Sequence, residues 1–105
     1  MSKMARGFFV SAALCLAFTQ AASTPAQAVC AKSVVLYNAY WCPYCRQVRA
    51  ILDRNRIKYS VLDATTPRVQ ASMIKRFGDT AVPRTIIGGV VVEGVDEARI
   101  RQLCR

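Results

Sequence analysis

The chain has 105 residues with a formal net charge of +9, five cysteines and no histidine. Its length limits it to one domain. The charge alone would suit nucleic acid, but the basic residues are spread along the chain and do not gather in a run. A solvated basic surface is therefore favoured, and we expect no nucleic-acid partner.

Residues 1–28 are typical of a secretory signal peptide. A positively charged start precedes the apolar residues 7–18, and Ala26-Gln27-Ala28 has the small-x-small form of a cleavage site. The apolar stretch is shorter than the roughly 20 residues that span a bilayer, so we expect no stable membrane span after cleavage. The predicted organisation is a signal peptide, 1–28, and a folded domain, 29–105, that is secreted across the inner membrane to the periplasm.

The folded part begins with a buried strand and an amphipathic helix. Residues 33–37 are too continuously apolar for a strand with one solvated face. Residues 43–55 then follow a helical period with one apolar stripe. The stripe consists of Tyr44, Val48, Ile51 and Leu52. Residues 58–63 alternate and predict a second strand, parallel to the first because crossover connections are right-handed.

The second half predicts a helix, a hairpin and a short final helix. Thr66 is a typical N-cap, Pro67 suits the first helical position, and Gly78 ends the helix. Residues 85–92 contain two apolar strands around a Gly-Gly pair, which predicts a two-residue turn. Asp96 can cap the last helix. The order β-α-β-α-β-β-α predicts an α/β domain with a four-stranded mixed sheet flanked by helices.

The chemistry is concentrated in Cys42-Pro43-Tyr44-Cys45, between the first strand and the first helix. A helix N-terminus stabilises an anion, so Cys42 is favoured as the thiolate that attacks a disulfide. Cys45 returns to the same side of the helix and can resolve the mixed disulfide. A zinc site would need further ligands at matching spacing. That site and a purely structural disulfide are the alternatives, and the context favours redox chemistry.

Several stretches, in the same order and spacing, resemble the glutaredoxin family. They are Leu36-Tyr37, Cys42-Pro43-Tyr44-Cys45, Met73-Ile74-Lys75-Arg76, Ala81-Val82-Pro83 and Gly94-Val95-Asp96-Glu97. The resemblance implies a minimal thioredoxin-like fold. It also implies a dithiol oxidoreductase that acts on protein disulfides or glutathione mixed disulfides in redox homeostasis and electron transport. Glutathione would be a co-substrate, with no permanently bound cofactor and no metal, and we expect a monomer.

The same resemblance implies a substrate groove around the dithiol. The peptide bond before Pro83 would be cis, which leaves the backbone of Val82 free to pair with an extended substrate. The start of the last helix, at Val95 and Asp96, would meet the γ-glutamyl carboxylate of glutathione, because a helix N-terminus suits an anion. Asp96 also has the simpler role of N-cap. The ring of Tyr44 would border the groove.

Three positions depart from the family pattern. Ala39 stands where glutaredoxins usually have a lysine that supports the thiolate and the glycine carboxylate of glutathione, and Arg46 or Arg84 is the candidate replacement. Glu93-Gly94 stands in place of a Gly-Gly pair. Both changes are expected to weaken glutathione binding. Trp41 resembles the thioredoxins, and it is either a docking surface for protein substrates or a packed loop residue.

Two cysteines remain in the folded part. Cys30 precedes the first strand, and the last helix runs back towards the same end of the domain, which brings Cys104 near it. An oxidising compartment favours a Cys30–Cys104 disulfide. In the alternative, Cys104 is a small buried apolar residue and Cys30 is a free terminal thiol.

Other functions stay open at this point. One is a thioredoxin-like protein disulfide oxidoreductase that does not use glutathione. Another is a non-catalytic module that binds a metal or an iron–sulfur cluster, although such glutaredoxins typically have a single active-site cysteine. A third is an electrostatic binding domain with a vestigial dithiol.

Overall fold

The computed structural model describes residues 30–105, and the predicted signal peptide lies outside the described residues. The elements are β1 (Val34–Asn38), α1 (Pro43–Arg54), β2 (Ser60–Asp63), α2 (Pro67–Phe77), β3 (Arg84–Ile87), β4 (Val90–Glu93) and α3 (Glu97–Leu103). The predicted order β-α-β-α-β-β-α is confirmed. Within residues 30–105 no helix is both long enough and apolar enough to cross a membrane.

The strands form one mixed sheet in the order β2-β1-β3-β4. β1 runs parallel to β2 and antiparallel to β3, and β3 runs antiparallel to β4. Gly88 and Gly89 join the last two strands with φ angles of 56° and 90°. A tight hairpin turn with positive φ at both central residues is the type that glycine favours. The predicted four-stranded mixed sheet and its hairpin are therefore confirmed.

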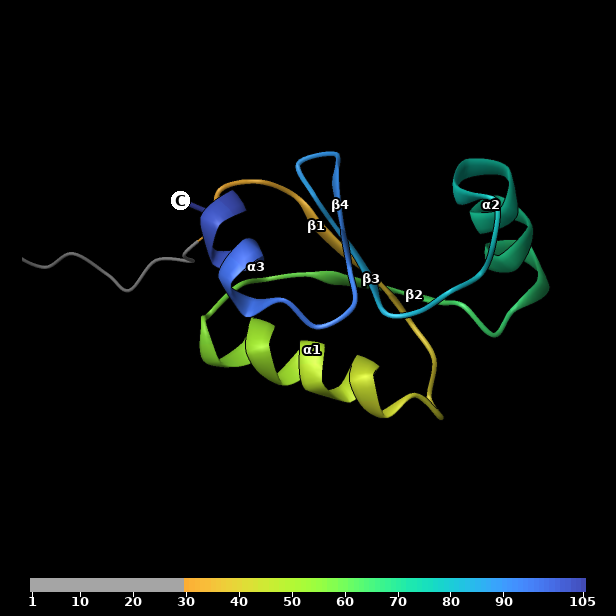
Figure 1. The fold of residues 1–105 in the computed structure, drawn as a ribbon, viewed down its shortest axis with the longest axis horizontal. Coiled ribbons are helices and arrows are strands. Elements are labelled where there is room, and N and C mark those ends of the chain that lie inside the picture. The colour runs from red at the N-terminus through yellow and green to blue at the C-terminus, as the bar shows by residue number, and fades with distance from the viewer. Residues whose placement is uncertain (1–29) are drawn as a thin grey trace, which may run out of the picture.

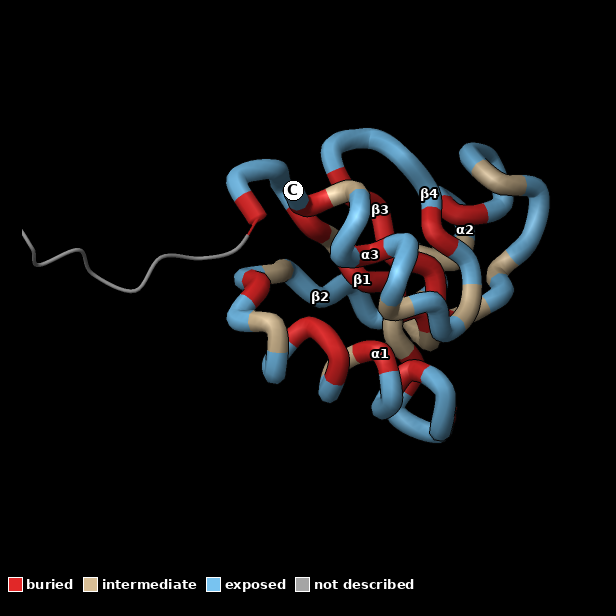
Figure 2. The backbone as a smooth tube through the Cα atoms, turned by 60° about the vertical axis from the view of Figure 1, so that its left-hand side comes forward, coloured by how far each residue is buried: buried red, intermediate tan, exposed pale blue. Residues whose placement is uncertain are grey.

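Helices cover both faces of the sheet (Figure 1). Leu36 of β1 packs in one cluster with Leu52 of α1 and Ile100 of α3. Tyr37, the next residue of β1, packs on the opposite face with Met73 of α2. Successive residues of a strand point to opposite faces, so β1 is buried on both sides as its apolar run predicts. Figure 2 shows this burial along β1, while the edge strand β2 is exposed.

Two details of burial differ from the sequence prediction. Tyr44, placed in the apolar stripe of the first helix, is 59 % exposed, and Cys45 is fully buried in its stead. In the first turn of α1, Cys45 therefore faces the core and Tyr44 faces solvent. The strand β2 lies at the edge, and Val61 and Leu62 are both exposed although their alternation predicted one buried face.

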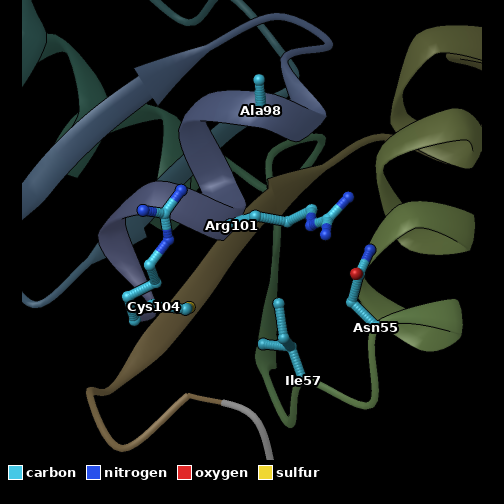
Figure 3. A pocket seen from close by; sticks show the side chains of 6 residues that line it. Asn55, Ile57, Ala98, Arg101 and Cys104 are labelled. Carbon is cyan, nitrogen blue, oxygen red and sulfur yellow. The ribbon is translucent and has the colours of Figure 1, made fainter.

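Cys30 and Cys104 form a disulfide with a Cα–Cα distance of 4.4 Å. Cys104 also borders a cavity of about 460 Å³ (Figure 3). Arg101 of α3 extends there towards Asn55, which caps the C-terminal end of α1. The cavity is therefore at the opposite end of α1 from the dithiol.

Candidate active site

Cys42 is the N-cap residue of α1. Its backbone is extended, with φ −94° and ψ 111°, and the helix begins at Pro43. The N–H of Cys45 donates to Cys42 Sγ over 3.1 Å. Side-chain acceptors are preferred at an N-cap because the first N–H groups of a helix have no backbone partner. The same hydrogen bond and the helix dipole stabilise a thiolate, which is the reactive form of the sulfur.

Cys45 is fully buried, whereas Cys42 is 4 % exposed. Burial, and then the hydrogen bond with Cys42, raises the pKa of the Cys45 thiol to about 11. The backbone N–H of Ala39 and the charge of Arg49 act in the opposite direction and lower it. Burial therefore makes Cys45 a weaker acid than an ordinary thiol. Cys42 is therefore the more accessible of the two sulfurs, and Cys45 is the protected one.

Iodoacetamide at neutral or mildly acidic pH should label Cys42 and leave Cys45 unmodified in the folded, reduced protein. Only a thiolate is alkylated, and Cys45 becomes one only as the pH approaches its pKa of about 11. Peptide mapping by mass spectrometry reads the two sites separately. The urea-unfolded protein is the control and should be labelled at both residues. Faster labelling of Cys45 than of Cys42 in the folded state would contradict the assignment of roles.

The Val82–Pro83 peptide bond is cis, as expected. Val82 packs against the cluster of Ala39, Cys42 and Cys45, so this loop lies beside the dithiol. The carbonyl of Pro83 accepts the N–H of Gly94 over 3.1 Å. The loop before β3 is thereby joined to the segment after β4, and both border the dithiol side of the sheet.

Aromatic residues next to the dithiol are exposed to solvent. Tyr40, Trp41 and Tyr44 have exposed fractions of 79 %, 62 % and 59 %. Trp41 is therefore not packed into its loop, which leaves docking as the better of its two interpretations. Tyr40 was missed from the sequence, although two consecutive aromatic residues just before a reactive cysteine are a signal of an exposed apolar surface.

At the start of α3, Asp96 acts as the N-cap. Its Oδ1 accepts the N–H of Arg99 over 3.0 Å, so the simpler of its two predicted roles is present. Val95 beside it is 41 % exposed. Val82 is next to Pro83 and Val95 is next to Gly94 in the chain. The Pro83–Gly94 hydrogen bond therefore joins the segments that carry the two valines.

The cations near the site are placed differently from the prediction. Arg84 cannot replace the missing lysine as a free surface charge, because its side chain is only 4 % exposed and forms ion pairs with Asp79 and Glu93. Arg46 is exposed on α1 and remains available. Arg49, which the sequence prediction overlooked, donates to Asn38 Oδ1 and lowers the pKa of Cys45 from one helical turn away.

No group of three or more Cys, His, Asp or Glu side chains that could hold a metal ion occurs within residues 30–105. Cys42 and Cys45 are the free cysteines of this part of the chain. Two adjacent thiols can release two electrons and two protons to form a disulfide, and the disulfide can take them up again.

Comparison with known proteins agrees with this arrangement. The glutaredoxin family model matches residues 34–92. A glutaredoxin of Pseudomonas aeruginosa is 32 % identical over 65 residues, which cover 61 % of this chain and 77 % of that protein. A glutaredoxin of Ricinus communis is 32 % identical over 72 residues, covering 65 % and 71 % of the two chains.

Solved structures share the fold. The crystal structure of a glutaredoxin from Archaeoglobus fulgidus matches with a TM-score of 0.62 at 22 % identity, covering 71 % of this chain and 88 % of that one. The solution structure of a Brucella melitensis glutaredoxin matches with a TM-score of 0.56 at 31 % identity, covering 69 % and 87 %. A buckwheat glutaredoxin in complex with glutathione matches with a TM-score of 0.55 at 23 % identity, covering 71 % and 72 %. With its thioredoxin-like sheet and its dithiol at a helix start, the chain belongs to the glutaredoxin family.

Proposed function

We propose that this protein is a dithiol oxidoreductase that reduces protein disulfides and glutathione mixed disulfides. The observation that carries the proposal is the contrast between the two sulfurs. Cys42 Sγ accepts a helix N-terminal N–H, whereas Cys45 is fully buried and has a pKa raised to about 11. A nucleophile and a protected resolving thiol are the two parts that thiol–disulfide exchange requires.

The reaction runs in two exchange steps. The Cys42 thiolate attacks one sulfur of the substrate disulfide, a Cys42–substrate disulfide forms, and the other substrate sulfur leaves as a thiolate that takes a proton from water. Cys45 then gives up its proton and attacks Cys42 Sγ, so that the Cys42–Cys45 disulfide forms and the second substrate thiolate leaves. The substrate gains two electrons and the dithiol loses two. Two equivalents of a thiol such as glutathione restore the dithiol.

Substrate binding is proposed at the surface around Cys42. The backbone of Val82, next to the cis proline, would pair with an extended substrate segment by strand addition. The exposed rings of Tyr40, Trp41 and Tyr44 would contact apolar side chains of protein substrates. For glutathione, the γ-glutamyl carboxylate would approach Val95 and Asp96.

The cellular location is proposed to be the periplasm, with residues 1–28 acting as a cleaved signal peptide. The Cys30–Cys104 disulfide supports an oxidising compartment, because such bonds are rare in the cytosol. Mass spectrometry of the protein purified from a periplasmic fraction should find Val29 as the first residue. Recovery of the intact chain from the cytosol would contradict this location.

A turnover assay tests the function directly. The substrates are the mixed disulfide of glutathione with a small thiol and a protein disulfide, each supplied with either glutathione or a thioredoxin-type donor. Reduction of at least one substrate, lost when Cys42 is replaced, is the expected result. Absence of turnover with both substrates and both donors would overturn the proposal and favour a binding module.

Replacing Ala39 with lysine should lower the KM for glutathione about fivefold. The new cation would contribute one contact to the carboxylates of glutathione, worth on the order of 1 kcal/mol near a surface. Ala39 is only 1 % exposed and packs against the dithiol, so Ala39→Met is the matched control for added side-chain volume. Equal KM values for the lysine and methionine variants would mean that Arg46 already supplies the charge or that glutathione is not the thiol used.

A further inference from the structure

Arg84 is a buried cation directly after the cis proline. The residue is 3 % exposed, and its Nη2 lies 3.0 Å from Asp79 Oδ1 and 3.5 Å from Glu93 Oε2. Its Cζ lies 4.3 Å from the centre of the Phe77 ring, at cation–π distance. A buried guanidinium is stable only when carboxylates or aromatic faces compensate its charge.

The two carboxylates belong to different segments of the chain. Asp79 precedes the cis-proline loop, and its Oδ1 also accepts the N–H of Ala81 over 3.1 Å. Glu93 ends β4 and pairs with Arg84 in the sheet register. One guanidinium nitrogen thus joins the segment that carries Val82 to the segment that leads to Val95.

The bond from Pro83 to Gly94 crosses between the same two segments. Arg84 and this backbone bond are therefore two successive links between the cis-proline loop and the turn before α3. The N–H of Ala81, followed by the guanidinium of Arg84, lowers the pKa of the Asp79 carboxyl below its usual value. Asp79 is therefore charged at neutral pH and holds its end of the connection.

Few contacts hold the guanidinium of Arg84 in place. Arg84 Nε and Nη1 are buried and have no hydrogen-bond partner among residues 30–105. The carboxylate side chains are 60 % and 70 % exposed, so each is free to turn towards water. The position of the guanidinium consequently depends on Nη2 and on the Phe77 ring, which itself packs edge-on against Tyr37 with 5.5 Å between ring centres.

We propose that Arg84, with Asp79 and Glu93, is a positioning clamp that fixes the distance between the Val82 and Val95 segments and so sets substrate affinity. This role rests on the proposed oxidoreductase function, because it assigns substrate contacts to both segments. The clamp is expected to act on binding and not on the sulfurs, since Arg84, Asp79 and Glu93 do not belong to the cluster of Ala39, Cys42 and Cys45, which the clamped segments meet through Val82. Arg84 is accordingly a positioning residue.

The test removes the two carboxylates in the variant Asp79→Asn/Glu93→Gln, which retains side-chain size at exposed positions. The KM for the disulfide substrate should rise on the order of tenfold, as expected when groups that orient a substrate move apart. The kcat at saturation and the rate of Cys42 alkylation should stay within about twofold. Arg84→Met serves as a second variant, and Arg76→Met is its matched control, because Arg76 is an exposed cation over the same Phe77 ring.

Hydrogen exchange at the Gly94 amide provides a readout that does not need activity. In the double variant the exchange of this amide should become faster, because the loop that carries its Pro83 acceptor is released. An unchanged KM, unchanged exchange at Gly94, or a fall in kcat together with slower Cys42 alkylation would each overturn the clamp. If the wild-type protein shows no turnover at all, the proposed function fails, and the exchange measurement alone decides whether the clamp exists.

Discussion

Replacing Cys42 with serine is expected to reduce disulfide exchange by at least about a thousandfold, the scale on which enzymes depend on their nucleophile. The hydroxyl of serine keeps the N-cap acceptor for the N–H of Cys45, so the fold is preserved while the reactive sulfur is lost. Cys45 is fully buried, and burial raises its pKa, so in this variant it should react with an external disulfide far more slowly than Cys42 does in the wild type. Initial rates with a protein disulfide measure the loss.

Cys45→Ser is the matched variant for the same assay. It should lose protein disulfide reduction, because the mixed disulfide at Cys42 then has no internal thiol to resolve it. Reduction of glutathione mixed disulfides should persist, since a second glutathione can release the adduct. Equal losses of activity in both variants with both substrates would contradict the assignment of Cys42 as the nucleophile and Cys45 as the resolving thiol.

Removing the Cys30–Cys104 disulfide should lower the free energy of unfolding by about 4 kcal/mol, as the chain-entropy model gives for a loop of this size. For a domain of this size such a loss corresponds to a fall in Tm of about 15 to 30 °C. Cys30→Ala/Cys104→Ala is the suitable variant because both cysteines lie in the main apolar cluster, where a serine hydroxyl would lack partners. Thermal unfolding followed by circular dichroism measures the change.

A reductant provides the control for that experiment. It should destabilise the wild-type protein and have a much smaller effect on the alanine variant, in which Cys42 and Cys45 are the cysteines that remain within residues 30–105. Activity below the Tm should be unchanged, because the disulfide lies at the end of the domain opposite the dithiol. A variant as stable as the wild type would show that the disulfide adds nothing to the stability of the fold.

Local signals made much of the fold predictable. Thr66, Asp96 and Gly78 act at the helix ends where their side chains or φ preferences suggest, since capping depends on residues within one turn. The dithiol was recognisable for the same reason, because its chemistry depends on the start of one helix.

Burial was less predictable because it depends on distant segments. Tyr44 and Cys45 both fit an apolar stripe with Val48, and the sequence cannot show which one faces the sheet. Arg84 was named as a candidate replacement for the missing lysine, and charged residues are usually exposed. Its burial depends on Asp79, Glu93 and Phe77, which lie on three different segments. The pairing of Arg84 with Glu93 could still be predicted from the sequence. A two-residue turn at Gly88-Gly89 fixes the register of the hairpin, and that register places the two residues opposite each other.

The most direct test of the central claim is to trap the first intermediate. The reduced Cys45→Ser protein is mixed with glutathione disulfide, quenched with acid and mapped by mass spectrometry. The account predicts one glutathione adduct per molecule, located on Cys42, and none on the Cys42→Ser protein treated in the same way. An adduct that forms on Cys45 of the Cys42→Ser protein at a comparable rate, or no adduct on Cys42, would contradict the assignment of Cys42 as the nucleophile.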